Sequence, residues 1–326
     1  MTDNSRTRPG SGILFILAGM VAISINDMLI KQMSGGYPLH QIVFTRSAIG
    51  LIFSLFLVQF EGGWSILRTR QPGLHIVRGL MVVISNMTFF LALAVIPLAD
   101  ATALFFAAPL FITVLSIPIL GEKVGPLRMG AVVVGFVGVI IMQRPWQGSE
   151  SLQADRIVLL LPLLAGLTYA IMQLMTRKLG ATTKASALAV YIQGMFIVVS
   201  LGFWLVAGDG RFAEGSDSAS VQFLLRAWVL PPTGDRWFFI GLGLNATIIG
   251  YCLSQAYRMS DAAAVAPFEY VGLPLAVFWG WMIWSDLPDW EVWIGMALIM
   301  GAGLFVFLRE QQKARQVARG EIKARY

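Results

Sequence analysis

Ten apolar stretches, each about as long as a membrane-crossing helix, dominate the sequence. A helix needs roughly 20 mostly apolar residues to cross the hydrocarbon core of a bilayer. The stretches that meet this requirement, bounded by charges, proline or glycine, are 11–33, 40–60, 74–96, 100–120, 126–143, 157–177, 186–207, 237–257, 262–284 and 291–308. We therefore expect an all-α polytopic membrane protein with ten transmembrane helices.

The composition agrees with a chain that is solvated by lipid. Hydrophobic residues make up 57% of the sequence and charged residues 13%, whereas about 25% of the residues are charged in an ordinary globular protein. So few charges cannot cover the surface of a soluble protein of 326 residues. The single cysteine, Cys252, excludes a disulfide scaffold and a thiolate cluster. We expect neither a cofactor nor a metal.

The basic residues are distributed unevenly between the two predicted faces. With ten spans both termini lie on one side, and that side carries 17 Lys and Arg residues against 6 on the other. The positive-inside rule then places both termini in the cytoplasm, together with the basic tail 311–326. The net charge of +6 is thereby explained by topology and by contact with the lipid bilayer, and we expect no nucleic-acid partner.

The two halves of the chain share an internal repeat. Leu-Ala-Gly at 17–19, followed by Lys31, corresponds at a constant offset of 147 to Leu-Ala-Gly at 164–166, followed by Lys178. Because each half has five spans, the halves begin on opposite sides of the membrane, so the repeat must be inverted. We expect two inverted five-helix repeats, 1–148 and 149–310.

Several motifs resemble those of a known transporter family. They are Leu93-Ala94-Val95-Ile96-Pro97-Leu98-Ala99-Asp100-Ala101-Thr102-Ala103-Leu104, 108–111 and 120–124 in the first half, and 256–262, 266–270 and 280–281 in the second. The chain is similar to EamA-type members of the drug/metabolite transporter superfamily. Ser285-Asp286 departs from the Gly-Glu that the family usually repeats there, so no role is carried onto that pair.

The resemblance implies both an architecture and an activity. Proteins of this type are ten-helix secondary transporters of the bacterial inner membrane, with a central substrate cavity between the halves. They move small organic metabolites by alternating access, without ATP hydrolysis.

Two charged residues fall at similar depths inside the first and second spans. Asp27 lies about six residues from the outer end of its span and Arg46 about six residues into the next, so both are roughly 9 Å deep at 1.5 Å per residue. A charge at this depth faces the interior or a partner. We predict that Asp27 and Arg46 share one network, either as a structural ion pair or as cavity residues that meet substrate charge.

Glu269 is the third charged residue inside a predicted span. It follows Pro267, which removes a backbone hydrogen bond, and a broken helix at membrane depth usually lines a cavity. Burial favours the neutral carboxyl, so Glu269 is a candidate proton-coupling residue as well as a substrate contact. The alternative is a hydrogen-bonded Glu that fixes helix packing.

Uncharged polar residues extend the candidate substrate site. Asn86 and Asn245 are the amides that we expect near the substrate, and Tyr251 and Tyr270 are candidate cavity walls or cation-π faces. Packing between helices is the alternative for each of the four.

A secondary transporter for a small-molecule substrate is the function that these features favour, and we expect no enzyme activity. Two interior acids and one interior arginine favour a zwitterionic or cationic metabolite, such as an amino-acid derivative or an adenosylmethionine-like or vitamin-like molecule. The alternatives are a membrane-embedded enzyme and a non-catalytic channel or scaffold subunit. Small residues in the fifth and tenth spans predict close helix contacts and allow a homodimer: Gly135, Gly138, Gly295, Gly301 and Gly303.

Overall fold

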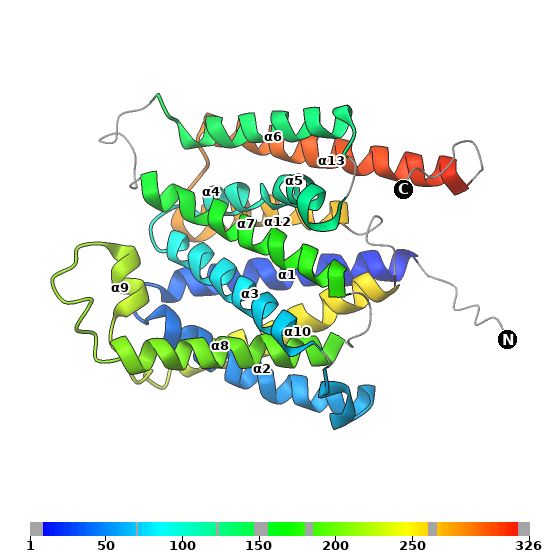
Figure 1. Cartoon of the computed structure of the whole chain (residues 1–326). Coiled ribbons are helices and arrows are strands. Elements are labelled where there is room, and N and C mark those ends of the chain that lie inside the picture. The colour runs from blue at the N-terminus through cyan, green and yellow to red at the C-terminus, as the bar shows by residue number, and fades with distance from the viewer. Residues whose placement is uncertain are drawn as a thin grey trace.

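The computed structural model describes residues 9–69, 71–121, 124–146, 156–179, 185–259 and 266–318, and its regular elements there are all helical (Figure 1). In this part of the chain nine helices are long and apolar enough to cross a membrane. Eight are unbroken: α1 Pro9–Met33, α2 Leu39–Glu61, α3 Pro72–Leu93, α6 Pro126–Gln143, α7 Arg156–Leu179, α8 Ala185–Ala207, α10 Arg236–Met259 and α13 Trp290–Ala318. A short 3-10 helix, η1 Trp64–Leu67, follows α2.

The fourth predicted span, 100–120, is broken, contrary to our expectation of one continuous helix. Its two parts are α4 Leu98–Phe105 and α5 Ala108–Leu120, which are counted together as the ninth candidate span. Pro109 lies in the first turn of α5, where its fixed φ and missing N–H favour the start of a helix over its continuation. The break leaves a turn at Phe106 and Ala107 within the bundle.

The ninth predicted span, 262–284, is also irregular. Its first residues lie outside the described part of the chain, and the rest forms a 3-10 helix, η3 Ala266–Val271, then α12 Gly272–Trp279 and a π-helical turn, η4 Gly280–Trp284. Prolines at 267 and 274 supply no N–H for a regular ladder. The count of ten spans therefore stays a prediction.

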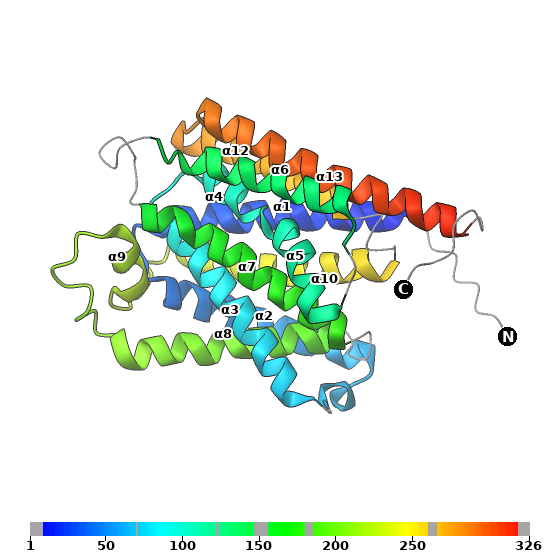
Figure 2. The same ribbon diagram turned by 45° about the horizontal axis from the view of Figure 1, so that its top comes forward.

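The helices pack in pairs that are far apart in sequence. α1 packs along α10, α3 along α7, α2 along α8, and α6 along α13. The start of α1 and the end of α13 lie at one end of the bundle, and the short helix α9 Ala219–Leu225 lies at the opposite end (Figures 1 and 2). This arrangement agrees with an even number of crossings.

The α6–α13 pair is held at close range by glycine, as the sequence predicted. A Cβ added to Gly138 would lie 2.9 Å from the Gly295 carbonyl oxygen, and a Cβ added to Gly295 would lie 2.9 Å from the Gly138 carbonyl oxygen. The expectation is wrong for Gly301, because a Cβ there would meet nothing within 4 Å.

Gly138→Ala is expected to destabilise the protein by about 1–3 kcal/mol, because the added methyl group overpacks a backbone contact that cannot relax. Gly130→Ala is the matched control on the same helix, since its Cβ would meet nothing within 4 Å. Thermal unfolding in detergent compares the two variants. Equal unfolding temperatures would contradict the close contact.

Candidate functional site

Asp27 and Arg46 belong to one interior network, which confirms the predicted link between them. Arg46 Nη1 donates to Asn26 Oδ1 at 3.2 Å, and Asn26 Nδ2 donates to Asp27 Oδ1 at 3.0 Å. Asn26 therefore stands between the two charges and hydrogen-bonds to both. Charge attraction between Asp27 and Arg46 adds to these hydrogen bonds.

Arg46 is surrounded by aromatic rings. Its guanidinium carbon lies 5.7 Å from the centre of the Phe90 ring and 5.3 Å from that of Phe196, which is cation-π distance. The residue is only 6% exposed, and its buried Nε has no hydrogen-bond partner. A buried N–H donor without an acceptor is costly, so Nε offers a site for a hydrogen-bond acceptor from a ligand.

Asp27 lies on the interior side of α1. Leu14, Ala18 and Val21 form the exposed stripe of this helix, and at 3.6 residues per turn Asp27 points about 140° away from Leu14. Its side chain is half-buried. The accessible surface that it keeps therefore faces the bundle interior, where an ionisable group is expected to have a functional partner.

A second polar group surrounds Glu269, which lies in η3 as a half-buried residue. Its charge acts on the hydroxyls of Tyr169 and Tyr270. The Tyr169 hydroxyl also accepts a hydrogen bond from Gln173 Nε2 at 2.7 Å. Glu269 and Tyr270 both lie on the irregular segment that the sequence predicted, and the charge of Glu269 reaches Tyr169 of α7 from there.

A continuous series of ring contacts joins the two polar groups. Phe90 contacts Phe89 at 5.8 Å between ring centres, Phe89 contacts Phe105 at 5.3 Å, and Phe105 contacts Tyr169 at 5.4 Å. We call Phe89, Phe90, Phe105 and Tyr169 the aromatic path. It runs through α3, α4 and α7, and it ends at Arg46 on one side and near Glu269 on the other.

A branch of these ring contacts reaches Tyr270 itself. Phe105 contacts Phe106 at 6.3 Å, and Phe106 contacts Tyr270 at 5.3 Å. Tyr270 Oη lies so close to α13 that a methyl group at Gly303 would overlap it. Both halves of the chain therefore contribute aromatic rings to the contacts between Arg46 and Glu269.

Three of the predicted site residues take other places. Asn86 donates to Val82 O of its own helix at 3.1 Å, and Asn245 donates to Ala22 O at 2.7 Å, which ties α10 to α1. Tyr251 is 42% exposed and shares the outer stripe of α10 with Leu244 and Ile248. These contacts are those of helix packing, and none joins the three residues to the Asp27–Arg46 network.

Sequence reasoning left some interior residues out. Phe90 and Phe196 carry no signal of their own, since aromatic residues are frequent throughout the spans. Lys31 donates to the carbonyls of Leu93 and Ile96, at 2.9 and 2.7 Å, and so caps the end of α3. Arg78 is one of the 17 basic residues assigned to the cytoplasmic side, and it is buried in α3 at 7% exposure.

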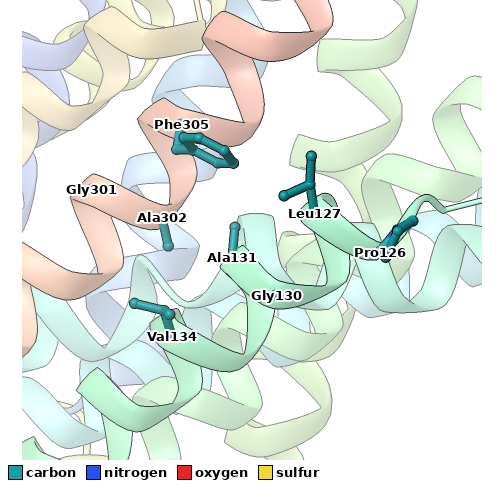
Figure 3. Close-up of a pocket in the computed structure, with 8 residues that line it drawn as sticks. All are labelled: Pro126, Leu127, Gly130, Ala131, Val134, Gly301, Ala302 and Phe305. Carbon is teal, nitrogen blue, oxygen red and sulfur yellow. The ribbon is translucent and has the colours of Figure 1, made fainter.

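Two hollows described in the structure lie away from this network. One is a groove of about 420 Å³ between α6 and α13, with an apolar lining (Figure 3): Pro126, Leu127, Gly130, Ala131, Val134, Gly301, Ala302 and Phe305. The other, of about 370 Å³, lies on α8 at 199–206. Neither includes a predicted site residue.

Comparison with known proteins finds a family match in the first half of the chain. Residues 10–144 match the EamA-like transporter family. The first half of the chain therefore carries an EamA-like transporter domain. The predicted resemblance is thereby confirmed, and with it the assignment of the apolar helices to a multi-pass membrane protein.

Curated relatives are similar to this chain over nearly their whole length. A riboflavin transporter of Rhizobium johnstonii is 29% identical over 94% of each chain, and an S-adenosylmethionine uptake transporter of Rickettsia prowazekii is 25% identical over 93% of this chain and 94% of its own. A pseudopaline exporter of Pseudomonas aeruginosa is 29% identical over 90% of this chain and 94% of its own.

A solved crystal structure shares the fold of this chain. It has a TM-score of 0.63 and 17% sequence identity, and the match covers 93% of this chain and 98% of the other. The likeness supports the helical architecture. The relatives' names include both uptake and export, and they differ in substrate. They therefore determine neither the direction of transport nor the substrate of this chain.

Proposed function

We propose that the protein is a secondary transporter that moves a small organic metabolite across the bacterial inner membrane by alternating access between two inverted halves. The relatives support the general activity, since riboflavin and S-adenosylmethionine transporters both match over most of the chain. The observation that carries the site is the buried Arg46, whose Nε lacks a partner next to the Asp27 network.

The helix pairing supports two related halves, 1–148 and 149–310. In the proposed equivalence α1 corresponds to α7, α3 to α10, and α2 to α8. Exchanging the halves then turns the α1–α10 pair into the α7–α3 pair, and both pairs are present. The α2–α8 and α6–α13 pairs each join two equivalent helices, so the exchange leaves these pairs unchanged. This is the pattern expected of an inverted repeat with its site between the halves.

The charges favour a zwitterionic or cationic substrate. Arg46 is suited to a carboxylate, because guanidinium donates two parallel hydrogen bonds to such a group. Asp27 lies one hydrogen-bonded residue away and is suited to an ammonium or another cationic group. The aromatic path gives a substrate ring or quaternary group faces against which to pack.

Glu269 is proposed as the coupling residue. A carrier needs a group whose affinity for an ion or substrate differs between its two states. Glu269 lies on a segment without a regular helical ladder, and its charge acts on tyrosines of α7 and of η3 itself. A rearrangement of this segment changes the surroundings of the carboxyl, and with them its proton affinity.

The purified protein is expected to be stabilised by its substrate in a thermal-shift screen of metabolites. A ligand at 100 times its dissociation constant contributes about 2.7 kcal/mol. Riboflavin, S-adenosylmethionine and a set of amino acids and their amides make up the screen. Zwitterionic or cationic hits whose shift is lost in Arg46→Lys support the proposed site. Hits restricted to polyvalent anions would contradict it.

A further inference from the structure

The segment 208–235 connects α8 to α10 and contains α9. It lies at the end of the bundle opposite the start of α1, which is the outer end in the predicted orientation (Figures 1 and 2). Although the segment belongs to the second half of the chain, its side-chain and backbone contacts reach the ends of α1, α2 and α3. A loop that served only to connect α8 with α10 would not require them.

Gln41 of α2 makes the most specific of these contacts. Its Nε2 donates to Val229 O at 2.6 Å, and Val229 N donates to Gln41 Oε1 at 3.0 Å. The side chain is thus held at both ends of its amide by one residue of the segment. Gln41 is only 6% exposed, so it lies under the segment and not beside it.

Further hydrogen bonds secure the segment along its length. His40 Nδ1 donates to Leu224 O at 2.9 Å, and Arg226 Nη1 donates to Gly35 O at 2.6 Å. Ser220 Oγ donates to Leu91 O at 3.1 Å. The Tyr37 hydroxyl donates to the Asp235 carboxylate at the end of the segment. Each of these bonds links the second half of the chain to the first.

Apolar contacts fill the space under the segment. Trp228 lies 5.3 Å from Phe44 between ring centres and 5.9 Å from His40. Phe223 of α9 is fully buried and belongs to the same core cluster as Val43 of α2. The segment is therefore packed into the end of the bundle.

The position of these contacts relates the segment to the candidate site. Gln41 and Arg46 lie on the same helix, five residues or roughly 7.5 Å apart along its axis. Asn26 and Asp27 precede by two turns the end of α1, where Gly35 accepts from Arg226. The segment is thus attached to α1 and α2 on the outer side of the Asp27–Arg46 network.

We propose that residues 208–235 form a gate, seated in this structure, that closes the outer end of the candidate substrate site. This inference rests on the proposed transport function, because a gate has a role only if a site must open. Alternating access then requires the bonds at Gln41, His40, Gly35 and Tyr37 to break when the site opens toward this end. The gate belongs to the second half of the chain and binds to the first half. Its detachment therefore accompanies a movement of one half relative to the other.

A reversible lock tests the gate. In a Cys252→Ala background, Gln41→Cys and Val229→Cys are joined by a short bifunctional methanethiosulfonate reagent. Transport in proteoliposomes should fall to background when the pair is linked and recover after reduction. The matched control is Asp209→Cys with Arg211→Cys, two exposed positions within the segment, where linking should leave the rate unchanged. Full transport by the linked Gln41–Val229 pair would overturn the proposal.

A labelling readout keeps the test independent of transport. A single reporter, Val43→Cys, is placed at a fully buried position under the segment, and its reaction with a maleimide is followed in detergent. Gln41→Ala should accelerate labelling. Thr45→Ala is the control, because Thr45 Oγ1 bonds only its own helix at Gln41 O. Equal rates in the two variants would exclude a gate held by Gln41. Faster labelling without any transport would contradict the proposed function but leave the opening of the segment standing.

Discussion

Arg46→Lys is expected to weaken substrate binding by about tenfold to a hundredfold while the protein still folds. Lysine keeps the positive charge beside Asn26 and Asp27 but lacks Nε and the planar fork. A hydrogen bond to a charged group contributes about 1.5–3 kcal/mol, which corresponds to this range of affinity. Arg46→Met should be more severe. Removing one partner of a buried charge pair costs about 3–5 kcal/mol, so this variant should lose stability as well as transport.

Arg78→Lys is the matched control for the arginine series. Arg78 is buried to a similar degree, with 7% exposure against 6% for Arg46, but it lies outside the Asp27–Arg46 network. Substrate-dependent thermal shifts and initial transport rates separate binding from folding. If Arg46→Lys binds and transports as the unchanged protein does, Arg46 is a structural residue of the α1–α2 contact.

Glu269→Gln is expected to abolish pH-driven accumulation and to retain exchange. Glutamine keeps the size and a hydrogen-bonding group, so its contacts with neighbouring side chains largely remain, but it cannot carry a proton. One pH unit corresponds to about 1.4 kcal/mol and supports at most about a tenfold concentration ratio with one proton per substrate. In the variant this ratio should fall to one, because proton movement no longer accompanies the substrate.

Glu61→Gln is the control for loss of a carboxylate. Glu61 lies at the end of α2 and accepts from Ser186 Oγ at 2.8 Å, away from the aromatic path. Uptake into proteoliposomes under an imposed pH gradient is compared with exchange at equal pH. Uphill transport by Glu269→Gln at the unchanged rate would remove Glu269 from the coupling step and return it to helix packing.

The spans were predictable because the bilayer sets their length and hydropathy, and it does so whether or not the helix within a span is continuous. The same property hides the breaks at Phe106–Ala107 and at Ala266–Val271. An apolar run stays apolar when its hydrogen-bond ladder is interrupted, and Pro109 and Pro267 were the available signals. Only Pro267 was read as a break, since it precedes an interior charge.

The candidate site was predictable in part. Their similar depths in neighbouring spans predicted that Asp27 and Arg46 lie close together. That Asn26 hydrogen-bonds to both of them depends on side-chain rotamers, which a sequence does not reveal. The exposed position of Tyr251 had a signal in the sequence, because Tyr251 repeats the spacing of Leu244 and Ile248 and so falls on their exposed stripe. The aromatic path could not be read from the sequence, since its rings come from three helices.

Counterflow in proteoliposomes tests the central claim, that this protein is a carrier, most directly. Vesicles loaded with a high concentration of an unlabelled hit from the thermal-shift screen are diluted into a trace of labelled compound. We expect a transient accumulation of label above its equilibrium level, because a carrier that brings labelled substrate in returns with unlabelled substrate from the concentrated internal pool. We also expect the overshoot to be lost in Arg46→Lys at the same substrate concentration. Simple equilibration of label without an overshoot would indicate a channel, and no entry of label would contradict transport of that compound altogether.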